Sequence, residues 1–168
     1  MIKVLNESVV FMDVDCIVNA ANTSLAGGGG VDGAIHNAAG QELYKACAKI
    51  GYCAVGDAVI TPGFNLKAKY IIHTVGPIYT YFDKKENENL LRKSYISCLD
   101  LAKENNIHSI AFPGISTGVY GYPIKEAVSI ALSTTKQWLD TNADYDLDIY
   151  FCCYTEEEYR EYNALILK

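Results

Sequence analysis

The sequence predicts an α/β fold, in which a sheet is covered by helices on both faces. Short runs rich in β-branched residues alternate with longer stretches of helical composition along the whole chain. Several of the short runs stop at Pro or at Gly-Pro, as strands do where they enter loops. The chain has 168 residues with no internal repeat or linker, so we expect a single domain over residues 1–168.

The first part of the chain is predicted to contain strands around one long helix. Apolar and β-branched residues are concentrated at Ile2–Leu5, Ser8–Phe11 and Asp15–Ala20, and a strand is expected at each. Val31–Ile50 carries apolar residues near a spacing of 3.6, so a helix is expected there. Asp57–Pro62 is again strand-like and stops at its proline.

The second part repeats the alternation. Phe82–Asn89 is predicted to be a charged loop that runs into a helix start, and Pro123 suits the first position of a later helix. Strands are expected at Tyr70–Pro77, Ser109–Gly114 and Leu147–Tyr154, and helices at Glu88–Asn105, Pro123–Asp140 and Glu156–Lys168.

Composition and charge exclude several functional classes. Half of the residues are hydrophobic, yet no run of about eighteen apolar residues occurs, so no membrane span is expected. The N-terminal residues lack the basic segment and continuous apolar core of a secretion signal, and a cytoplasmic location is expected. The net charge of −6 argues against nucleic acid or an anionic membrane as a partner. It leaves room for a small anionic ligand held by local donors.

The cysteines fit either buried thiols or metal ligands. They form no C-x-x-C pair, and no His stands at a ligand-like spacing from a pair of them. Most lie in apolar runs, where free Cys behaves as a small hydrophobe. We therefore expect structural thiols in a reducing compartment and no metal, for all six: Cys16, Cys47, Cys53, Cys98, Cys152 and Cys153.

Two glycine-rich segments, Ala26–His36 and Pro113–Ala127, each follow a predicted strand and precede a predicted helix. Ligands bind at such positions in α/β folds, and the free N–H groups of a helix N-terminus attract anions. Neither segment has the Walker lysine or the dinucleotide glycine pattern. Residues 12–41 and 111–124 contain no Lys or Arg, so backbone amides and hydroxyls would have to hold a phosphate. The glycines can also serve only as turns, but four in succession beside Asn-Ala-Ala-Asn and Asp favour ligand contact.

Three stretches together resemble the macrodomain family, in particular its MacroD-like branch of hydrolases: VDCIVNAANTSLAGGGGVDGAIHNAAG, GDAVITPGFNLKAKYIIHTVGP and IAFPGISTGVYGYP. The resemblance runs from about Asp13 to the C-terminus. It implies a three-layer α/β/α domain with a central mixed, mostly parallel sheet, an ADP-ribose cleft at the strand ends, and no cofactor. Members of this branch remove ADP-ribose from acidic side chains of mono-ADP-ribosylated proteins and deacetylate O-acetyl-ADP-ribose. A non-catalytic reader of ADP-ribose is the alternative.

The resemblance also implies roles for individual residues. Asn22 would hydrogen-bond the distal ribose, Asp32 would orient or activate the attacking water near the anomeric carbon, and His36 would support that face. The diphosphate and distal ribose would be bound by Gly28, Gly29, Gly30, Val31, Ser116, Thr117, Gly118, Val119 and Tyr120.

Recognition of adenine is where the sequence departs from the family. The family usually carries Gly-Asp-Ile-Thr before the first motif, and its Asp grips the adenine amino group. Glu7 and Ser8 stand at the Gly-Asp positions here, and either offers an acceptor. We expect them to hold adenine together with Val9 and with Tyr154, which would stack on the ring.

The residues taken alone leave other interpretations open. Asp32 can simply complement the dipole of the helix that it begins. His36 can be a hydrogen-bonded core residue, and a structural role is expected for His73. Tyr154 can be an edge aromatic of the core.

Overall fold

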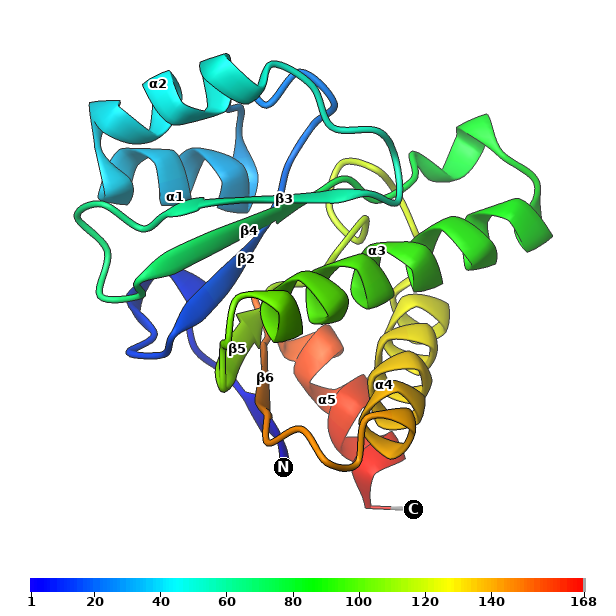
Figure 1. Ribbon diagram of the computed structural model, residues 1–168. Coiled ribbons are helices and arrows are strands. Elements are labelled where there is room, and N and C mark those ends of the chain that lie inside the picture. Colours follow the sequence, from blue (N-terminus) through cyan, green and yellow to red (C-terminus); the bar gives the residue numbers. More distant parts are fainter. Residues whose placement is uncertain (168) are drawn as a thin grey trace.

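The computed structural model describes residues 1–167. Its centre is a six-stranded sheet in the order β1-β6-β5-β2-β4-β3 (Figure 1). Neighbouring strands are parallel except for the antiparallel pair β3 and β4, so the predicted mixed, mostly parallel sheet is confirmed. The strands are β1 (Ile2–Leu5), β2 (Cys16–Ala20), β3 (Ala58–Pro62), β4 (Tyr70–Thr74), β5 (Ser109–Phe112) and β6 (Asp148–Cys152).

Helices cover both faces of the sheet, which confirms the three-layer α/β/α architecture (Figure 1). Two short helices lie over one face and three longer ones over the other. The first pair is α1 (Gly30–Ala39) and α2 (Gln41–Ile50), and the other three are α3 (Lys84–Glu104), α4 (Ile124–Thr141) and α5 (Glu156–Ile166).

Each face of the sheet has its own apolar core, because successive side chains of a strand point to opposite faces. Ile17 and Ile71 pack with Leu43 under α1 and α2. Ile72 and Phe112 pack on the opposite face, against α3, α4 and α5. The six cysteines are free and buried, as expected for structural thiols.

Residues 1–167 contain neither a metal-binding cluster nor a helix that could span a membrane. The described part of the chain holds no cluster of three or more His, Cys, Asp or Glu side chains that could bind a metal ion. Within the same residues, every helix is too short or too polar to cross a membrane.

The strand predicted at Ser8–Phe11 is wrong. These residues form one turn of 3-10 helix, η1 (Val9–Phe11), with Ser8 as its N-cap. The Ser8 hydroxyl accepts a hydrogen bond from the backbone N–H of Val10 at 3.3 Å. Because Val9 and Val10 are both buried, the β-branched run enters the core as a tight turn instead of pairing with a strand.

Two helix predictions also need correction. The helix expected over Val31–Ile50 is divided at Gly40, whose φ of +98° ends α1 and turns the chain into α2. The charged loop expected at Phe82–Asn89 is mostly helix, because α3 begins at Lys84. The Asp83 side chain caps α3 by accepting from the Glu86 N–H at 2.8 Å. A further turn, η2 (Tyr79–Tyr81), was not predicted.

The topology brings the two glycine-rich loops together. One loop leaves β2 for α1 and the other leaves β5 for α4, and β2 and β5 are parallel neighbours in the sheet. Their carboxyl ends therefore lie at the same edge, where α/β folds bind ligands.

Candidate active site

A cleft of about 560 Å³ opens at this edge of the sheet. It contains every predicted binding residue and two of the three predicted catalytic residues. Those that line it are Glu7, Ser8, Val9, Asn22, Gly28, Gly29, Gly30, Val31, Asp32, Ser116, Thr117, Gly118, Val119, Tyr120 and Tyr154. The third predicted catalytic residue, His36, lies outside the lining.

The glycines of the first loop serve two purposes. Gly30 begins α1 with a φ of +57°, a backbone conformation that side chains disfavour. A Cβ at Gly33 would overlap the carbonyl oxygen of Gly28, so Gly33 lets α1 pack against its own loop. A Cβ at Gly29, in contrast, would meet no atom within 4 Å. Local packing therefore explains Gly33, whereas Gly29 keeps the cleft open beside the helix N-terminus.

The second loop is fixed by hydrogen bonds. Ser116 has a φ of +66°, and its hydroxyl donates to the carbonyl oxygen of Pro77 at 2.8 Å. Thr117 donates to the carboxylate of Glu158 on α5 at 3.2 Å. Both hydroxyls are engaged within the protein, so the backbone N–H groups are the donors left for an anion. Within residues 1–167, neither Lys nor Arg lines the cleft.

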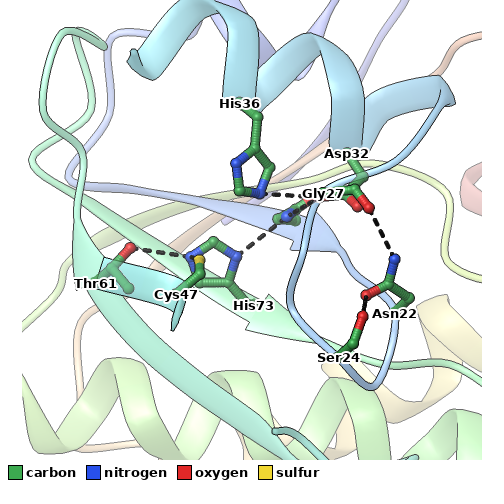
Figure 2. A network of polar contacts seen from close by, with 9 residues as sticks. Asn22, Ser24, Gly27, Asp32, His36, Cys47, Thr61 and His73 are labelled. Carbon is green, nitrogen blue, oxygen red and sulfur yellow. Dashed lines mark hydrogen bonds and ion pairs between the residues drawn. The ribbon is translucent and has the colours of Figure 1, made fainter. Parts of the chain in front are cut away.

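Asp32 lies in the first turn of α1 (Figure 2). Its side chain is largely buried, with the residue only 7% exposed. Its Oδ1 accepts a hydrogen bond from the Asn19 amide at 2.8 Å and lies 3.4 Å from His36 Nε2. Its Oδ2 lies on the side of Gly28, where an added Cβ would stand 3.4 Å away. Burial raises the pKa of Asp32, while the Asn19 bond and the nearby His36 oppose that rise. One oxygen is thus anchored and the other is turned to the cleft.

Asn22 follows β2 and lies close to Asp32 (Figure 2). Its amide nitrogen donates to the carbonyl oxygen of Gly27 at 3.0 Å, and its oxygen accepts from the Ser24 hydroxyl at 2.9 Å. An added Cβ at Gly28 would stand 3.7 Å from the Asn22 nitrogen, so this amide also borders the cleft. The second N–H of the amide can donate to a ligand hydroxyl.

His36 lies behind Asp32, one turn further along α1, and is 1% exposed. Its ring packs against Tyr44, with 4.3 Å between the ring centroids. Burial lowers the pKa of His36, which keeps the imidazole neutral at neutral pH. The geometry agrees with support of Asp32 from inside the protein, and that role stays a prediction.

The opposite end of the cleft is open. Tyr154 follows β6 and is 95% exposed. Glu7 and Ser8 line this region, but the Ser8 hydroxyl already accepts the capping bond from Val10. The structure brings the residues predicted for adenine into one cleft, and their roles stay predictions.

Sequence reasoning missed two buried polar residues of this region. Asn19 holds Asp32, and its signal was a polar residue inside the β-branched run Asp15–Ala20. Glu158 is 4% exposed, lines the cleft and holds Thr117. Its signal was a Thr155-x-x-Glu158 spacing, typical of a helix N-terminus, and nothing in that spacing indicates a cleft residue.

The fold and the site together define a class of protein. Its members are three-layer α/β/α domains whose cleft contains one buried carboxylate and neutral hydrogen-bond donors suited to an anion. The sequence model of the family described as Macro domain matches residues 18–131. The chain belongs to this family.

Two relatives align with nearly all of the chain. An O-acetyl-ADP-ribose deacetylase of Escherichia fergusonii is 51% identical, over 98% of this chain and 94% of its own length. The ADP-ribose glycohydrolase MACROD2 of Xenopus laevis is 50% identical over 90% of this chain, which spans 36% of that protein.

Solved structures agree with the fold. The Oceanobacillus iheyensis macrodomain with ADP is 43% identical with a TM-score of 0.92, covering 98% of this chain and 88% of that one. The Trypanosoma brucei macrodomain in complex with ADP-ribose is 42% identical with a TM-score of 0.92, covering 98% of this chain and 68% of that one.

Proposed function

We propose that this protein is an ADP-ribose-binding hydrolase that removes ADP-ribose from acidic side chains of mono-ADP-ribosylated proteins, deacetylates O-acetyl-ADP-ribose, or does both. The observation that carries the proposal is the free Asp32 Oδ2 beside Asn22, in a cleft between two glycine-rich loops. The names of the E. fergusonii and X. laevis relatives support the same chemistry.

The diphosphate of ADP-ribose fits between the two loops. The free N–H groups at the start of α1 and the dipole of that helix attract anions without a cationic side chain. Gly29 leaves space for a phosphate to approach the backbone. Asn22 and Asp32 then face the distal ribose, and Tyr154 offers its exposed ring to adenine.

Asp32 acts on water in this proposal. A carboxylate near the scissile bond can position water and accept its proton. For a protein substrate, the water oxygen bonds to the anomeric carbon and the bond from that carbon to the side-chain carboxylate oxygen breaks. For O-acetyl-ADP-ribose, the water oxygen bonds to the acetyl carbon and the bond from that carbon to the ribose oxygen breaks, so acetate forms and the departing ribose oxygen takes up a proton. In both cases the water proton passes to Asp32, and ADP-ribose is a product.

Turnover assays test this proposal. Wild-type protein is expected to release ADP-ribose from a glutamate-modified protein, from O-acetyl-ADP-ribose, or from both. Asp32→Ala and Asn22→Ala should abolish release while calorimetry still detects ADP-ribose binding. Full activity in both variants contradicts the assigned roles. Binding by the wild-type protein without any product over hours, on both substrates, would make it a reader.

A further inference from the structure

Three buried polar side chains form a row across β2, β4 and β3, on the face that α1 and α2 cover. Asn19 and His73 are partners in the register of β2 with β4, and both are fully buried. Thr61 on β3 is 4% exposed. Burying polar groups among apolar side chains is unfavourable unless each group is hydrogen-bonded, so the partners of this row are informative.

The hydrogen bonds of the row have fixed directions. The Thr61 hydroxyl lies 3.1 Å from the carbonyl oxygen of Pro62 and 2.9 Å from His73 Nε2. The Asn19 amide nitrogen donates to the Asp32 carboxylate and also lies 3.1 Å from His73 Nδ1, so we assign Nδ1 as an acceptor and the His73 proton to Nε2. The second N–H of that amide donates to Asp32 Oδ1 at 2.8 Å.

This pattern allows one orientation of the Asn19 amide. Turning it over would place its oxygen against the Asp32 carboxylate and against the lone pair of His73 Nδ1. The orientation is maintained although Asn19 Oδ1 has no hydrogen-bond partner of its own among residues 1–167. A buried acceptor left unpaired is costly, so the two donated bonds decide the placement of this side chain.

Two groups approach Asp32 Oδ1, the Asn19 amide at 2.8 Å and His36 Nε2 at 3.4 Å, so Asn19 makes the shorter contact. His36 on α1, Cys47 on α2, His73 on β4 and Tyr120 on the second loop all act electrostatically on Asp32 or on the row. Burial lowers the pKa of His73 to about 3 and raises that of the Cys47 thiol to about 11. Both are therefore uncharged at neutral pH.

We propose that Asn19 is a positioning residue for the reaction, and that His73 and Thr61 orient it so that it anchors Asp32 Oδ1 and leaves Oδ2 for the attacking water. This inference rests on the proposed function. In this arrangement the Asp32 carboxylate is held by the rigid sheet as well as by its own helix, α1. The chain of donors also explains why a histidine and a threonine lie deep in this core.

Three variants separate the steps. Asn19→Leu removes the donor to Asp32, and His73→Leu removes the acceptor that orients the donor. In His73→Asn, the side-chain oxygen stands where Nδ1 stood, so the acceptor is restored. The first two variants should lower kcat by roughly 10²-fold, the effect of a small misplacement of a catalytic group, with KM nearly unchanged. His73→Asn should recover most of kcat.

The pH dependence of kcat distinguishes a positioning role of Asn19 from a purely structural one, because only the positioning role should shift it. Loss of a hydrogen bond to a carboxylate favours its protonated form, so Asn19→Leu should move the acid limb of the kcat profile upward by about one pH unit. Ile71→Val, which alters a buried side chain on the same face of β4, is the matched control and should keep the wild-type limb.

A carbon-13 NMR titration of the Asp32 carboxyl, without substrate, tests the inference independently of turnover. The apparent pKa should rise in Asn19→Leu and His73→Leu and return toward the wild-type value in His73→Asn. An unchanged Asp32 titration in folded His73→Leu and Asn19→Leu would overturn the inference. If Asn19→Leu does not fold, the two His73 variants decide the matter. If the wild-type protein has no turnover, the proposed function fails while this titration still decides the positioning role.

Discussion

The two ends of the cleft are built in opposite ways. At one end, Asp32 is 7% exposed and hydrogen-bonded to a side chain of the sheet. At the other, Tyr154 is 95% exposed. A catalytic carboxylate that must act at one atom needs a fixed position and little water around it. The flat adenine ring, in contrast, needs only an apolar surface on which to stack. Variants at the two ends should therefore change different kinetic constants.

The largest effect is expected at the buried end. Asp32→Asn keeps the shape of the side chain and removes the base, so kcat should fall by about 10²- to 10⁴-fold while ADP-ribose affinity is retained. Steady-state kinetics and calorimetry measure the two quantities. Asp13→Asn, which alters an exposed aspartate outside the cleft lining, is the control. A comparable loss in both variants would remove the distinction between the ends.

Two glycines of the first loop test what holds the buried end together. Gly33→Ala forces a Cβ into the Gly28 carbonyl, so it should lower the free energy of unfolding by about 3 kcal/mol. Gly29→Ala adds its Cβ in open space and should leave stability nearly unchanged, but weaken ADP-ribose binding. Urea unfolding and calorimetry separate the effects. Unchanged affinity in Gly29→Ala would contradict a phosphate at this position.

His73 gives the buried end a pH-dependent stability. Its folded-state pKa of about 3 lies below its ordinary value of 6.5, so the unfolded chain binds the proton first and stability falls as pH falls through this window. Between pH 6.5 and pH 5 this one group should remove about 2 kcal/mol. Urea unfolding of wild type and His73→Asn over this range isolates the effect as their difference.

The smallest effect is expected at the open end. Tyr154→Ala should weaken ADP-ribose binding roughly tenfold, about 1.4 kcal/mol, with kcat nearly unchanged. Tyr154→Phe keeps the aromatic ring and removes only the hydroxyl, so it should change affinity much less. Calorimetry compares the two variants. Equal losses would contradict stacking by the ring.

The sequence predicted the elements that follow from local patterns. Alternating strand-like and helical stretches indicated the α/β layers, and glycines after β2 and β5 indicated the cleft. The turn at Val9–Phe11 was not predictable in this way, because β-branched residues usually favour strands. It depends on burial of two valines in a core that forms only in the folded chain.

The hydrogen bonds that hold Asp32 in place were even harder to predict from the sequence. Asn19, Thr61 and His73 are far apart in sequence, and they meet only through the registers of β2 with β4 and of β4 with β3. A shift of one residue in either register would turn a member of the row to the opposite face. Motif reasoning therefore found the residues that face the cleft and missed those that hold them in place.

Among residues 1–167 no lysine or arginine lines the cleft, and the protein has a net charge of −6, so ligand binding should depend on ionic strength in an unusual way. Backbone amides and helix dipoles attract a diphosphate only at short range, while the excess of acidic groups repels it from further away. Salt screens the long-range repulsion more than the close contacts. Association with an anionic nucleotide should therefore become faster as salt rises, opposite to the behaviour of clefts lined with basic side chains.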